Sequence, residues 1–374
     1  MIESLYIHIP FCDSICSYCS FKKQIYNEEQ SKKYILNLLD DLKRIPKCSL
    51  KTIYIGGGTP SSLADNDLEI LLSNLRPLLK EDYEFTIESN PENLTFNKAK
   101  IFNKYGVNRV SIGVQTFNEK FLKLLSRKHS LNDINEAVNN LLLNNINNIN
   151  FDLIYGLPFQ ALNDFILDIK YLKNFPLTHV SLYSLTIDEN TIFNNLKYEE
   201  ADEDLLRDMS DEATKILSEY GFNKYEVSNY SKPNYESKHN LTYWFDNEYY
   251  GIGISASGYE NNIRYKNITS LRKYNEGERK FEEEKVDDFN HEYEFIMLNL
   301  RTKYGIDLDR YKEIFNKDFL KTYKNEIVKL SDFIIIYNNK ITVKDNNYMI
   351  LNTLILEFIK KLEDDFYGKS NIEK

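Results

Sequence analysis

Cysteine is scarce in this sequence, with four residues in a chain of 374. Secreted proteins that depend on disulfides are much richer in cysteine. The N-terminal residues also lack the basic start and long apolar core of a secretory signal. Together these features argue against a disulfide framework and favour a reducing compartment, so we expect a cytoplasmic protein.

Long apolar segments and an excess of basic residues are also missing. The richest apolar stretch, Met349 to Ile359, is interrupted by Asn352, Thr353 and Glu357, whereas a spanning helix needs about 20 mostly apolar residues. Lys and Arg number 47 against 57 Asp and Glu, which gives a formal net charge of −10. A nucleic-acid partner favours a basic surface. The sequence therefore predicts no nucleic-acid partner and no integral membrane span, while transient contact with a membrane-bound acceptor stays open.

Three of the four cysteines lie within one short segment, at Cys12, Cys16 and Cys19, with the spacing Cys-x3-Cys-x2-Cys. A [4Fe–4S] cluster has four irons that each normally take one thiolate, so three thiolates leave one iron open to a substrate or cofactor. A structural zinc site built from these cysteines and His8 is the alternative, although zinc ligands usually come as two separated pairs. Cys48 has no cysteine near it in the sequence and is interpreted as an ordinary thiol.

Short β-branched and aromatic runs alternate with longer helical patterns over the first half of the chain. The runs predict strands at Ser4–Ile9, Thr52–Ile55, Tyr83–Glu88, Arg109–Val114, Ile149–Ile154 and His179–Leu185. Helical patterns between them include Glu28–Leu42 and Asp65–Leu79. Repeated strand–helix units predict a parallel sheet with right-handed crossovers, either open or curled into a barrel. In both architectures ligands bind beyond the carboxyl ends of the strands, where the cysteine segment falls.

The end of the chain has a different pattern. From about Glu292 the sequence becomes helical, and Phe333–Ile336 and Ile341–Val343 flank an Asn-Asn turn that predicts a hairpin. A further helix is predicted from Asn347 to Leu362. Helices around a small hairpin indicate a winged-helix-like module. Because acidic rather than basic residues follow, we interpret it as a packing or cap module.

Other polar residues stand where predicted strands end. The run Gly56-Gly57-Gly58-Thr59-Pro60 follows the second strand, and glycines allow a backbone to approach a ligand closely. Glu88, Gln115 and Asp152 end three later strands. Each alone is typical of a tight turn, a helix cap or a surface group. Together with the cysteines they indicate a site at one edge of the sheet.

With these motifs in this order, the chain resembles the radical S-adenosylmethionine (radical SAM) superfamily. Within it, the chain is similar to the oxygen-independent coproporphyrinogen III oxidase-like group, most closely to its heme chaperone branch. The resemblance runs from Ser4 to beyond Tyr259 and is weaker over the C-terminal module. It implies an α/β fold, a partial (β/α)6 barrel with a small C-terminal helical, winged-helix-like module. The implied divisions are residues 1–220 for the barrel, 221–290 for a flanking extension and 291–374 for the C-terminal module.

The resemblance also implies cofactors and their ligands. Cys12, Cys16 and Cys19 would hold a [4Fe–4S] cluster whose open iron binds S-adenosylmethionine. The implied contacts of that cofactor are Tyr6, Tyr18, Gly57, Gly58, Thr59, Glu88, Gln115, Arg127, Asp152, Thr186 and Ser257. An arginine can pair with the methionine carboxylate as a fork, and a carboxylate can accept hydrogen bonds from ribose hydroxyls. His8 matches a position near the cluster, where it would relay a proton or donate to a sulfide as the catalytic candidate.

Two features bear on the branch. The oxidases carry a fourth cysteine two residues after the third and a longer N-terminal arm, whereas this chain has Phe21 at that position. Conversely, His239-Asn240-x-x-Tyr243-Trp244 matches the signature of the chaperone branch. There the histidine is a candidate heme ligand, and Tyr243 and Trp244 would stack on a porphyrin. The plain alternative is that His239 fixes a loop and Trp244 fills core.

The prediction that follows is a cytoplasmic radical SAM protein that binds heme and delivers it to apo-hemoprotein acceptors. The first alternative is an oxygen-independent coproporphyrinogen III oxidase of porphyrin biosynthesis, which Phe21 disfavours. The second is a zinc-stapled structural barrel without radical chemistry.

Overall fold

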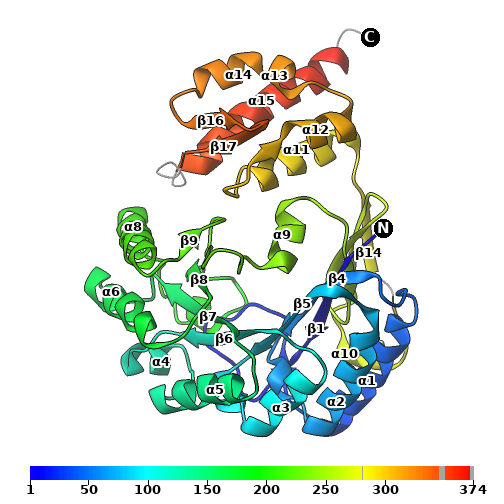
Figure 1. Ribbon diagram of the computed structural model, residues 1–374, viewed down its shortest axis with the longest axis vertical. Coiled ribbons are helices and arrows are strands. Elements are labelled where there is room, and N and C mark those ends of the chain that lie inside the picture. Colours follow the sequence, from blue (N-terminus) through cyan, green and yellow to red (C-terminus); the bar gives the residue numbers. More distant parts are fainter. Residues whose placement is uncertain (280, 345–349, 371–374) are drawn as a thin grey trace. The chain divides into compact units, whose positions relative to one another are not determined.

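A large parallel sheet forms from the strand–helix repeats of the first half of the chain. In the computed structural model, which describes residues 1–279, 281–344 and 350–370, six strands run parallel in sequence order (Figure 1). They are β1 (Ser4–Ile9), β4 (Leu50–Gly57), β5 (Leu79–Ser89), β6 (Arg109–Gln115), β7 (Asn148–Tyr155) and β8 (His179–Ser184). β11 (Tyr250–Ile252) pairs parallel with β1, and β10 (Asn229–Ser231) pairs antiparallel with β8. The six parallel strands are thus confirmed, and with β9 (Asn223–Lys224) beyond β10 they belong to a nine-stranded sheet whose end strands are β11 and β9.

Helices return the chain from each strand to the next and cover one side of the sheet (Figure 1). They are α1 (Glu28–Leu42), α2 (Asp65–Leu75), α3 (Phe96–Lys104), α4 (Glu119–Leu124), α5 (Leu131–Leu143), α6 (Leu162–Tyr171) and α8 (Glu203–Glu219). The predicted bounds of α1 are confirmed. The prediction that α2 extends to Leu79 is wrong, because Pro77 has no amide hydrogen to donate. A 3-10 turn, Arg76–Leu78, follows α2 instead, and β5 begins at Leu79.

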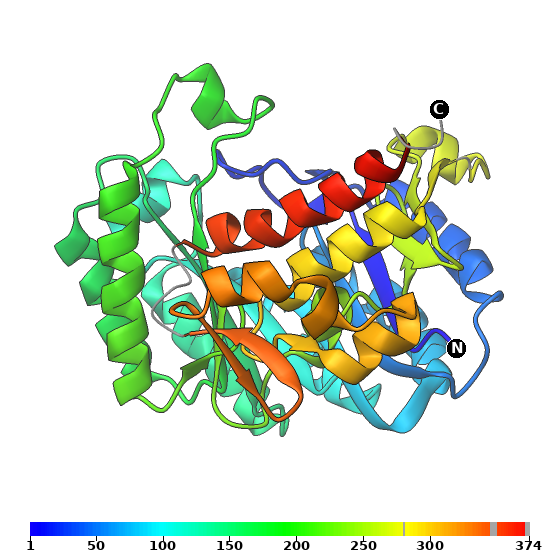
Figure 2. The same ribbon diagram turned by 90° about the horizontal axis from the view of Figure 1, so that it is seen from above.

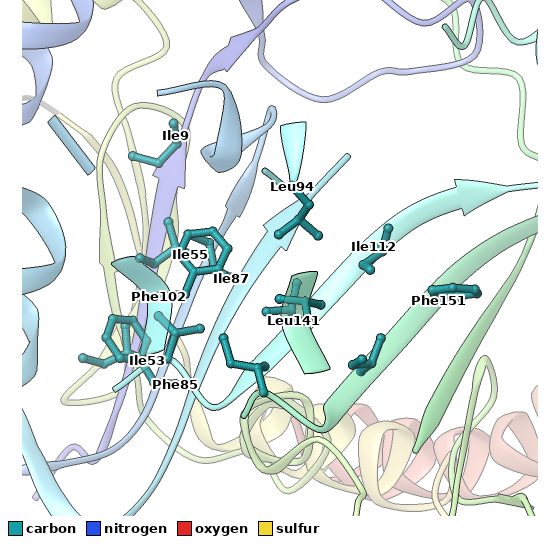
Figure 3. Packing of buried hydrophobic residues seen from close by; sticks show 14 of the residues in the cluster. Ile9, Ile53, Ile55, Phe85, Ile87, Leu94, Phe102, Ile112, Leu141 and Phe151 are labelled. Atoms are coloured by element: carbon teal, nitrogen blue, oxygen red, sulfur yellow. The ribbon is translucent and has the colours of Figure 1, made fainter. Parts of the chain in front are cut away.

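Side chains alternate between the two faces of each strand, and this separates an apolar layer from a polar interior. The side that meets the helices carries the hydrophobic core. Ile53, Ile55, Phe85, Ile87, Ile112 and Phe151 from the strands belong to one buried cluster with Phe102 and Leu141 from the helices (Figure 3). The opposite positions hold polar groups such as His8, Tyr54, Glu88, Ser111 and Asp152. The hydrophobic core therefore lies between the sheet and the helices, and the opposite face of the sheet carries the polar side chains that can bind a ligand.

The loops at the carboxyl ends of the strands are supported by short elements. β2 (Phe11–Cys12) pairs with β3 (Gln24–Ile25), so both ends of the cysteine loop are held together. The segment after β8 carries the short helix α7 (Ile192–Asn195), and the Phe193 amide donates to the Ser17 carbonyl at 3.1 Å. Figure 2 shows this green segment projecting next to the dark blue cysteine-bearing loop.

The described chain divides into two compact units. The first comprises Met1–Asn223, Ser228–His239 and Glu248–Glu284, and it includes a small sheet of β12 (Ser257–Glu260), β13 (Ile263–Asn267) and β14 (Phe281–Lys285) as well as α10 (Leu271–Asn275). The second comprises Lys224–Val227, Asn240–Asn247 and Lys285–Lys374. The region that the sequence assigned to a flanking extension is therefore shared between the units, and α9 (Lys238–Trp244) crosses from one to the other.

The second unit is helical around a hairpin. Its elements are α11 (Asp288–Asn299), β15 (Ile306–Asp307), α12 (Leu308–Phe315), α13 (Phe319–Thr322), α14 (Lys324–Lys329), β16 (Ile334–Tyr337), β17 (Lys340–Val343) and α15 (Leu351–Ser370). β16 and β17 confirm the predicted hairpin, and Asn338 and Asn339 take the left-handed backbone of its turn, with φ of 46° and 61°. The predicted start of the last helix at Asn347 lies outside the described residues. Every helix in the described part of the chain is too short or too polar to span a bilayer.

Candidate functional site

A cavity of about 350 Å³ opens in the first unit at the carboxyl ends of the parallel strands. Cys12, Cys16 and Cys19 all contribute to its wall. The other predicted residues that line it are Tyr18, Gly57, Gly58, Thr59, Glu88, Gln115, Arg127, Asp152 and Thr186. Residues from widely separated parts of the sequence thus meet where the parallel sheet was expected to place a ligand.

The cysteine loop is held by backbone hydrogen bonds. The Ser17 amide donates to the Leu125 carbonyl at 3.1 Å, and the Tyr26 amide donates to the Cys12 carbonyl at 2.9 Å. Burial raises the pKa of Cys12 to about 11 and also raises the pKa of Cys19. Iron is bound by thiolate, and a bound cation reverses the effect of burial by favouring the deprotonated ligand. The loop therefore presents protected thiols that a cationic centre would deprotonate.

The donor set fits a multi-iron cluster better than a single zinc ion. His8, the proposed fourth zinc ligand, already uses both ring nitrogens: Nε2 lies 2.8 Å from the Lys22 carbonyl oxygen and Nδ1 lies 3.1 Å from the Tyr6 hydroxyl. A carbonyl only accepts, so Nε2 carries the proton and Nδ1 accepts from Tyr6. Burial also lowers the pKa of His8, which favours this neutral form. Among the described residues, no three His, Cys, Asp or Glu side chains converge as they would around one metal ion.

The glycine run packs directly against the cysteine loop. The Gly58 amide donates to the Ile9 carbonyl and the Thr59 amide to the Phe11 carbonyl, both at 2.7 Å. A Cβ at Gly58 would lie 2.7 Å from the Phe11 carbonyl oxygen, so only glycine fits there. Gly57 has a φ of 113°, which other residues rarely adopt. The run thus brings its backbone next to Cys12, and the Thr59 hydroxyl donates to the Cys12 sulfur at 3.5 Å.

Two half-buried carboxyl groups, Glu88 and Asp152, also line the cavity. Glu88 accepts from the Tyr54 hydroxyl at 2.8 Å and from the Gly57 amide at 3.0 Å. Burial, and then the nearby charge of Asp152, raise the pKa of Glu88 to about 7. Asp152 accepts from the Ser111 hydroxyl at 2.7 Å, and burial raises its pKa as well. Acceptors of this kind in a cavity wall suit the hydroxyl and ammonium groups of a polar ligand.

Arg127 connects the cysteine side of the cavity to the strands. Its guanidinium donates to the Asn90 side-chain oxygen at 2.8 Å and to the Gly113 carbonyl at 2.5 Å. The Nη1 atom lies 3.7 Å from the Cys16 sulfur, and the Nε atom is buried without a hydrogen-bond partner. A half-buried guanidinium with an unused donor, beside one of the three thiols, is placed to bind an anionic group such as a carboxylate.

Some predicted residues lie outside the cavity wall. The Tyr6 ring stacks on Tyr54 with 6.2 Å between centroids, which places it one layer behind the wall. Ser257 is exposed in the small sheet, where it pairs with Lys266 rather than with any strand of the large sheet. Their roles as cofactor contacts, like the catalytic role of His8, stay predictions.

The candidate heme ligand His239 lies at the amino ends of the strands. Its side chain is 1% exposed, its Nδ1 lies 2.8 Å from the Thr52 hydroxyl, and its ring stacks on Tyr54 at 5.2 Å. Burial, and then the positive charge of Arg109, lower the pKa of His239 to about 3. The imidazole is thus neutral, as iron ligation requires, but it is enclosed. Tyr243 and Trp244 belong to the second unit and are half-buried there.

Several wall residues were not predicted, among them Tyr54, Asn90, Ser111, Tyr183 and Ser184. Strand periodicity carried a signal for two of them. Tyr54 stands two residues before Gly56 on β4, and Ser111 stands opposite Glu88 in the register of β5 and β6. Positions two residues apart share a face, so a polar residue inside a β-branched strand pointed to the same interior.

Comparisons with known proteins agree with this geometry. Residues 6–172 match the family model of the radical SAM superfamily. The heme chaperone HemW of Lactococcus lactis subsp. lactis is 37% identical over 96% of this chain and 97% of its own length. The heme chaperone HemW of Escherichia coli is 37% identical over 68% of this chain and 69% of its own length. The solved structure of the Escherichia coli coproporphyrinogen III oxidase HemN has a TM-score of 0.82, with 20% identity, 96% of this chain and 90% of that chain covered. The last similarity concerns the fold.

Proposed function

The chain belongs to the HemW family of radical SAM proteins, and we propose that it binds heme and delivers it to acceptor hemoproteins. The observation that carries this proposal is the identity of 37% to a heme chaperone over nearly the whole length of both chains. The cysteine-lined cavity supports it further, because the cofactors of the superfamily require such a site. We place this activity in the cytoplasm and leave room for transient contact with a membrane-bound acceptor.

Different residues of the cavity would bind the cluster and S-adenosylmethionine. Cys12, Cys16 and Cys19 would ligate three irons of a [4Fe–4S] cluster and leave the fourth open. When bound, the cluster supplies one electron that cleaves a carbon–sulfur bond of S-adenosylmethionine. The backbone of the glycine run, packed against the loop, would hold the methionine end of that cofactor close to the open iron.

Charged side chains of the wall would orient the same cofactor. Arg127, whose Nη1 atom lies 3.7 Å from the Cys16 sulfur, would pair with the methionine carboxylate. Glu88 would accept from its ammonium group in the ionised form, and Asp152 would accept from ribose hydroxyls. Both carboxyl groups are half-buried in the cavity wall, so a ligand that fills the cavity would exclude water from them and strengthen these interactions.

For heme we propose contact with the His239-Asn240-x-x-Tyr243-Trp244 segment. His239 is 1% exposed, so its imidazole reaches heme iron only if α9 moves away from Thr52. The same imidazole has a structural role in this conformation, because it fills space against Tyr54 and Thr52. The assignment therefore needs an experiment that separates ligation from folding.

The test uses anaerobically reconstituted protein. We expect stoichiometric heme binding, seen as a heme absorption spectrum that titrates to saturation, and no protoporphyrinogen from coproporphyrinogen III in the presence of a reductant and S-adenosylmethionine. His239→Ala should change the heme spectrum if the imidazole ligates iron. Matched His291→Ala, which removes a histidine of the second unit paired with Asp246 at 3.0 Å, serves as the control. Turnover of coproporphyrinogen III without heme binding would overturn the proposal in favour of the oxidase.

A further inference from the structure

The carboxyl end of β6 brings a residue with an unusual backbone conformation into the wall of the cysteine cavity. Pairing of β6 with β7 is interrupted after Gly113, because Val114 is an extra residue before Gln115 pairs with Leu153. A bulge of this kind bends a strand and redirects a side chain. Gln115 has a φ of 68°, which residues other than glycine adopt rarely, and it lines the cavity. Such a conformation persists only where neighbouring groups hold it.

The side-chain amide of Gln115 lies beside the arginine that would bind the methionine carboxylate. A Cβ built on Gly113 would lie 2.8 Å from the Nε2 atom of Gln115. The same position would be 3.4 Å from Nη2 of Arg127 and from Oδ1 of Asn90. The three polar groups therefore share the space above Gly113. An amide can both donate and accept, so beside a guanidinium it suits a ligand that carries a carboxylate and an ammonium group.

The residues that follow Gln115 are held by a buried carboxylate of α6. Asp168 is 4% exposed, and it accepts from the Thr116 hydroxyl at 2.6 Å and from the Phe117 amide at 2.9 Å. The Thr116 hydroxyl in turn accepts from the Asn118 amide at 3.1 Å. Burial raises the pKa of Asp168 to about 6, and these two hydrogen bonds oppose that rise. The carboxylate thus stays in place because the backbone and the hydroxyl after Gln115 satisfy it.

The ring of Phe117 fixes the same segment among the aromatic residues of the hydrophobic core. Its centroid lies 4.8 Å from that of Tyr171, which also belongs to α6, and it stacks on Phe175 at 5.7 Å. The chain therefore passes from the cavity wall at Gln115 to the hydrophobic core at Phe117 within two residues. Asp168 holds the backbone between these two positions, because its hydrogen bonds go to the two residues that follow Gln115.

We propose that Asp168 is a positioning residue of the S-adenosylmethionine site, because it holds Gln115 in its left-handed conformation beside Arg127. This inference rests on the proposed binding of S-adenosylmethionine in the cysteine cavity. Asp168 itself lies outside the wall of that cavity, so it acts on the ligand through the backbone of Thr116 and Phe117. Without the carboxylate, Gln115 relaxes toward ordinary backbone conformations, and its side chain leaves the space beside Arg127.

The test measures S-adenosylmethionine binding by calorimetry on anaerobically reconstituted protein. Asp168→Ala should weaken binding by roughly tenfold. Asp168→Asn should restore most of the affinity, because its side-chain oxygen still accepts from the Phe117 amide. The matched control Asp164→Ala removes a carboxylate at the start of the same helix, where it accepts from the Ala161 amide at 3.0 Å. This control should lower the free energy of unfolding and leave the affinity unchanged, which separates positioning from stability.

A double-mutant cycle with Gln115→Ala shows whether Asp168 acts through Gln115. Gln115→Ala should weaken binding by itself, and adding Asp168→Ala should then cause no further loss of affinity. Additive losses, or an unchanged affinity in Asp168→Ala, would overturn the proposal. An unchanged affinity in Gln115→Ala would also overturn it and would leave the proposed function intact. A parent protein that binds no S-adenosylmethionine would overturn both the cofactor site and this proposal.

Hydrogen exchange of the metal-free protein supplies a readout that does not involve the cofactors. Asp168→Ala should speed exchange in the peptide that contains Gln115 and Phe117, because the Phe117 amide loses its acceptor. Exchange in the core of the parallel strands should stay slow, and Asp164→Ala should leave the Gln115 peptide unchanged. Equal exchange of that peptide in the parent and in Asp168→Ala would show that the carboxylate does not hold the segment, and the proposal would fail.

Discussion

Glu88→Gln offers a sharp test of the interior electrostatics of this protein. Glu88 is half-buried in the polar interior, and desolvation, followed by the charge of Asp152, raises its pKa from 4.5 to about 7. Glutamine has the same shape and does not titrate. Its oxygen can accept from the Gly57 amide while its amide group donates to the Tyr54 hydroxyl, so both existing partners stay satisfied.

The magnitude follows from linkage between protonation and folding. A pKa difference of about 2.5 corresponds to about 3 kcal/mol at 1.36 kcal/mol for each pKa unit. The folded state holds this proton more tightly than the unfolded state. The contribution of Glu88 to the free energy of unfolding is therefore complete below pH 4.5 and is lost as the pH rises through about 7. The variant lacks this loss, so its stability relative to the parent should rise by up to about 3 kcal/mol between pH 5 and pH 8.

The assay is urea denaturation of the metal-free protein at several pH values, with the parent measured in parallel. The control Glu136→Gln changes an exposed glutamate of α5 that accepts from Asn132 at 3.1 Å, and because its side chain is solvated the change should affect the urea midpoint little. A difference between parent and Glu88→Gln that stays flat from pH 5 to pH 8, or that changes in the opposite direction, would refute the reasoning. Near pH 8, where the variant should be more stable than the parent, it should also bind S-adenosylmethionine more weakly. Such a trade is expected when a carboxylate that serves function lowers the stability of the fold.

Three further predictions concern the cysteine loop, the arginine of the cavity wall and the buried histidine. Replacing any one of the three loop cysteines by alanine should abolish the roughly four irons per chain expected after reconstitution, while Cys48→Ala should keep them. Zinc in place of iron in anaerobic metal analysis would contradict this. Arg127→Met should weaken S-adenosylmethionine binding by about 1–3 kcal/mol in calorimetry, whereas the exposed control Lys128→Met should not. Equal affinities of the two variants would show that Arg127 does not bind the methionine carboxylate. His239→Ala should lower the free energy of unfolding by about 1–3 kcal/mol, because Thr52 loses its buried partner. An unchanged urea midpoint would show that the His239 side chain does not stabilise the fold.

The fold could be predicted largely because its strands follow simple physical rules. β1 and α1 have the predicted bounds, since apolar residues alternate along the strand and Asn27 caps the helix by accepting from the Gln30 amide. Where the prediction failed, at the end of α2, the leucine periodicity continued past a proline that a helix interior does not tolerate. Periodicity reports which face is apolar, but backbone chemistry decides where an element stops.

The part of the candidate site that could be predicted lies in loops at strand ends, where sequence motifs mark it. Cysteine spacing and a glycine run are local signals, and the parallel sheet brings them together without further information. Tyr54 and Ser111 were missed because they lie inside strands that otherwise read as hydrophobic. Their inward direction depends on register, which the strand pairings fix: Tyr54 lies next to Tyr6, and Ser111 lies next to Glu88.

The His239 motif can be found in the sequence, but the surroundings of the side chain in the fold cannot be predicted from it. Its chemistry, a neutral imidazole, is what a heme ligand needs, and the sequence supplies that. Its surroundings come only from the tertiary structure, in which the Glu84 carboxylate accepts from the His239 amide at 3.1 Å and the Thr52 hydroxyl meets Nδ1 at 2.8 Å. These contacts hold the first residues of α9 against the amino ends of β4 and β5. Heme ligation by His239 would have to break them, so it would couple heme binding to the release of α9. A heme affinity that rises when Thr52→Val weakens this anchor would support such coupling, and an affinity indifferent to it would move the ligand elsewhere.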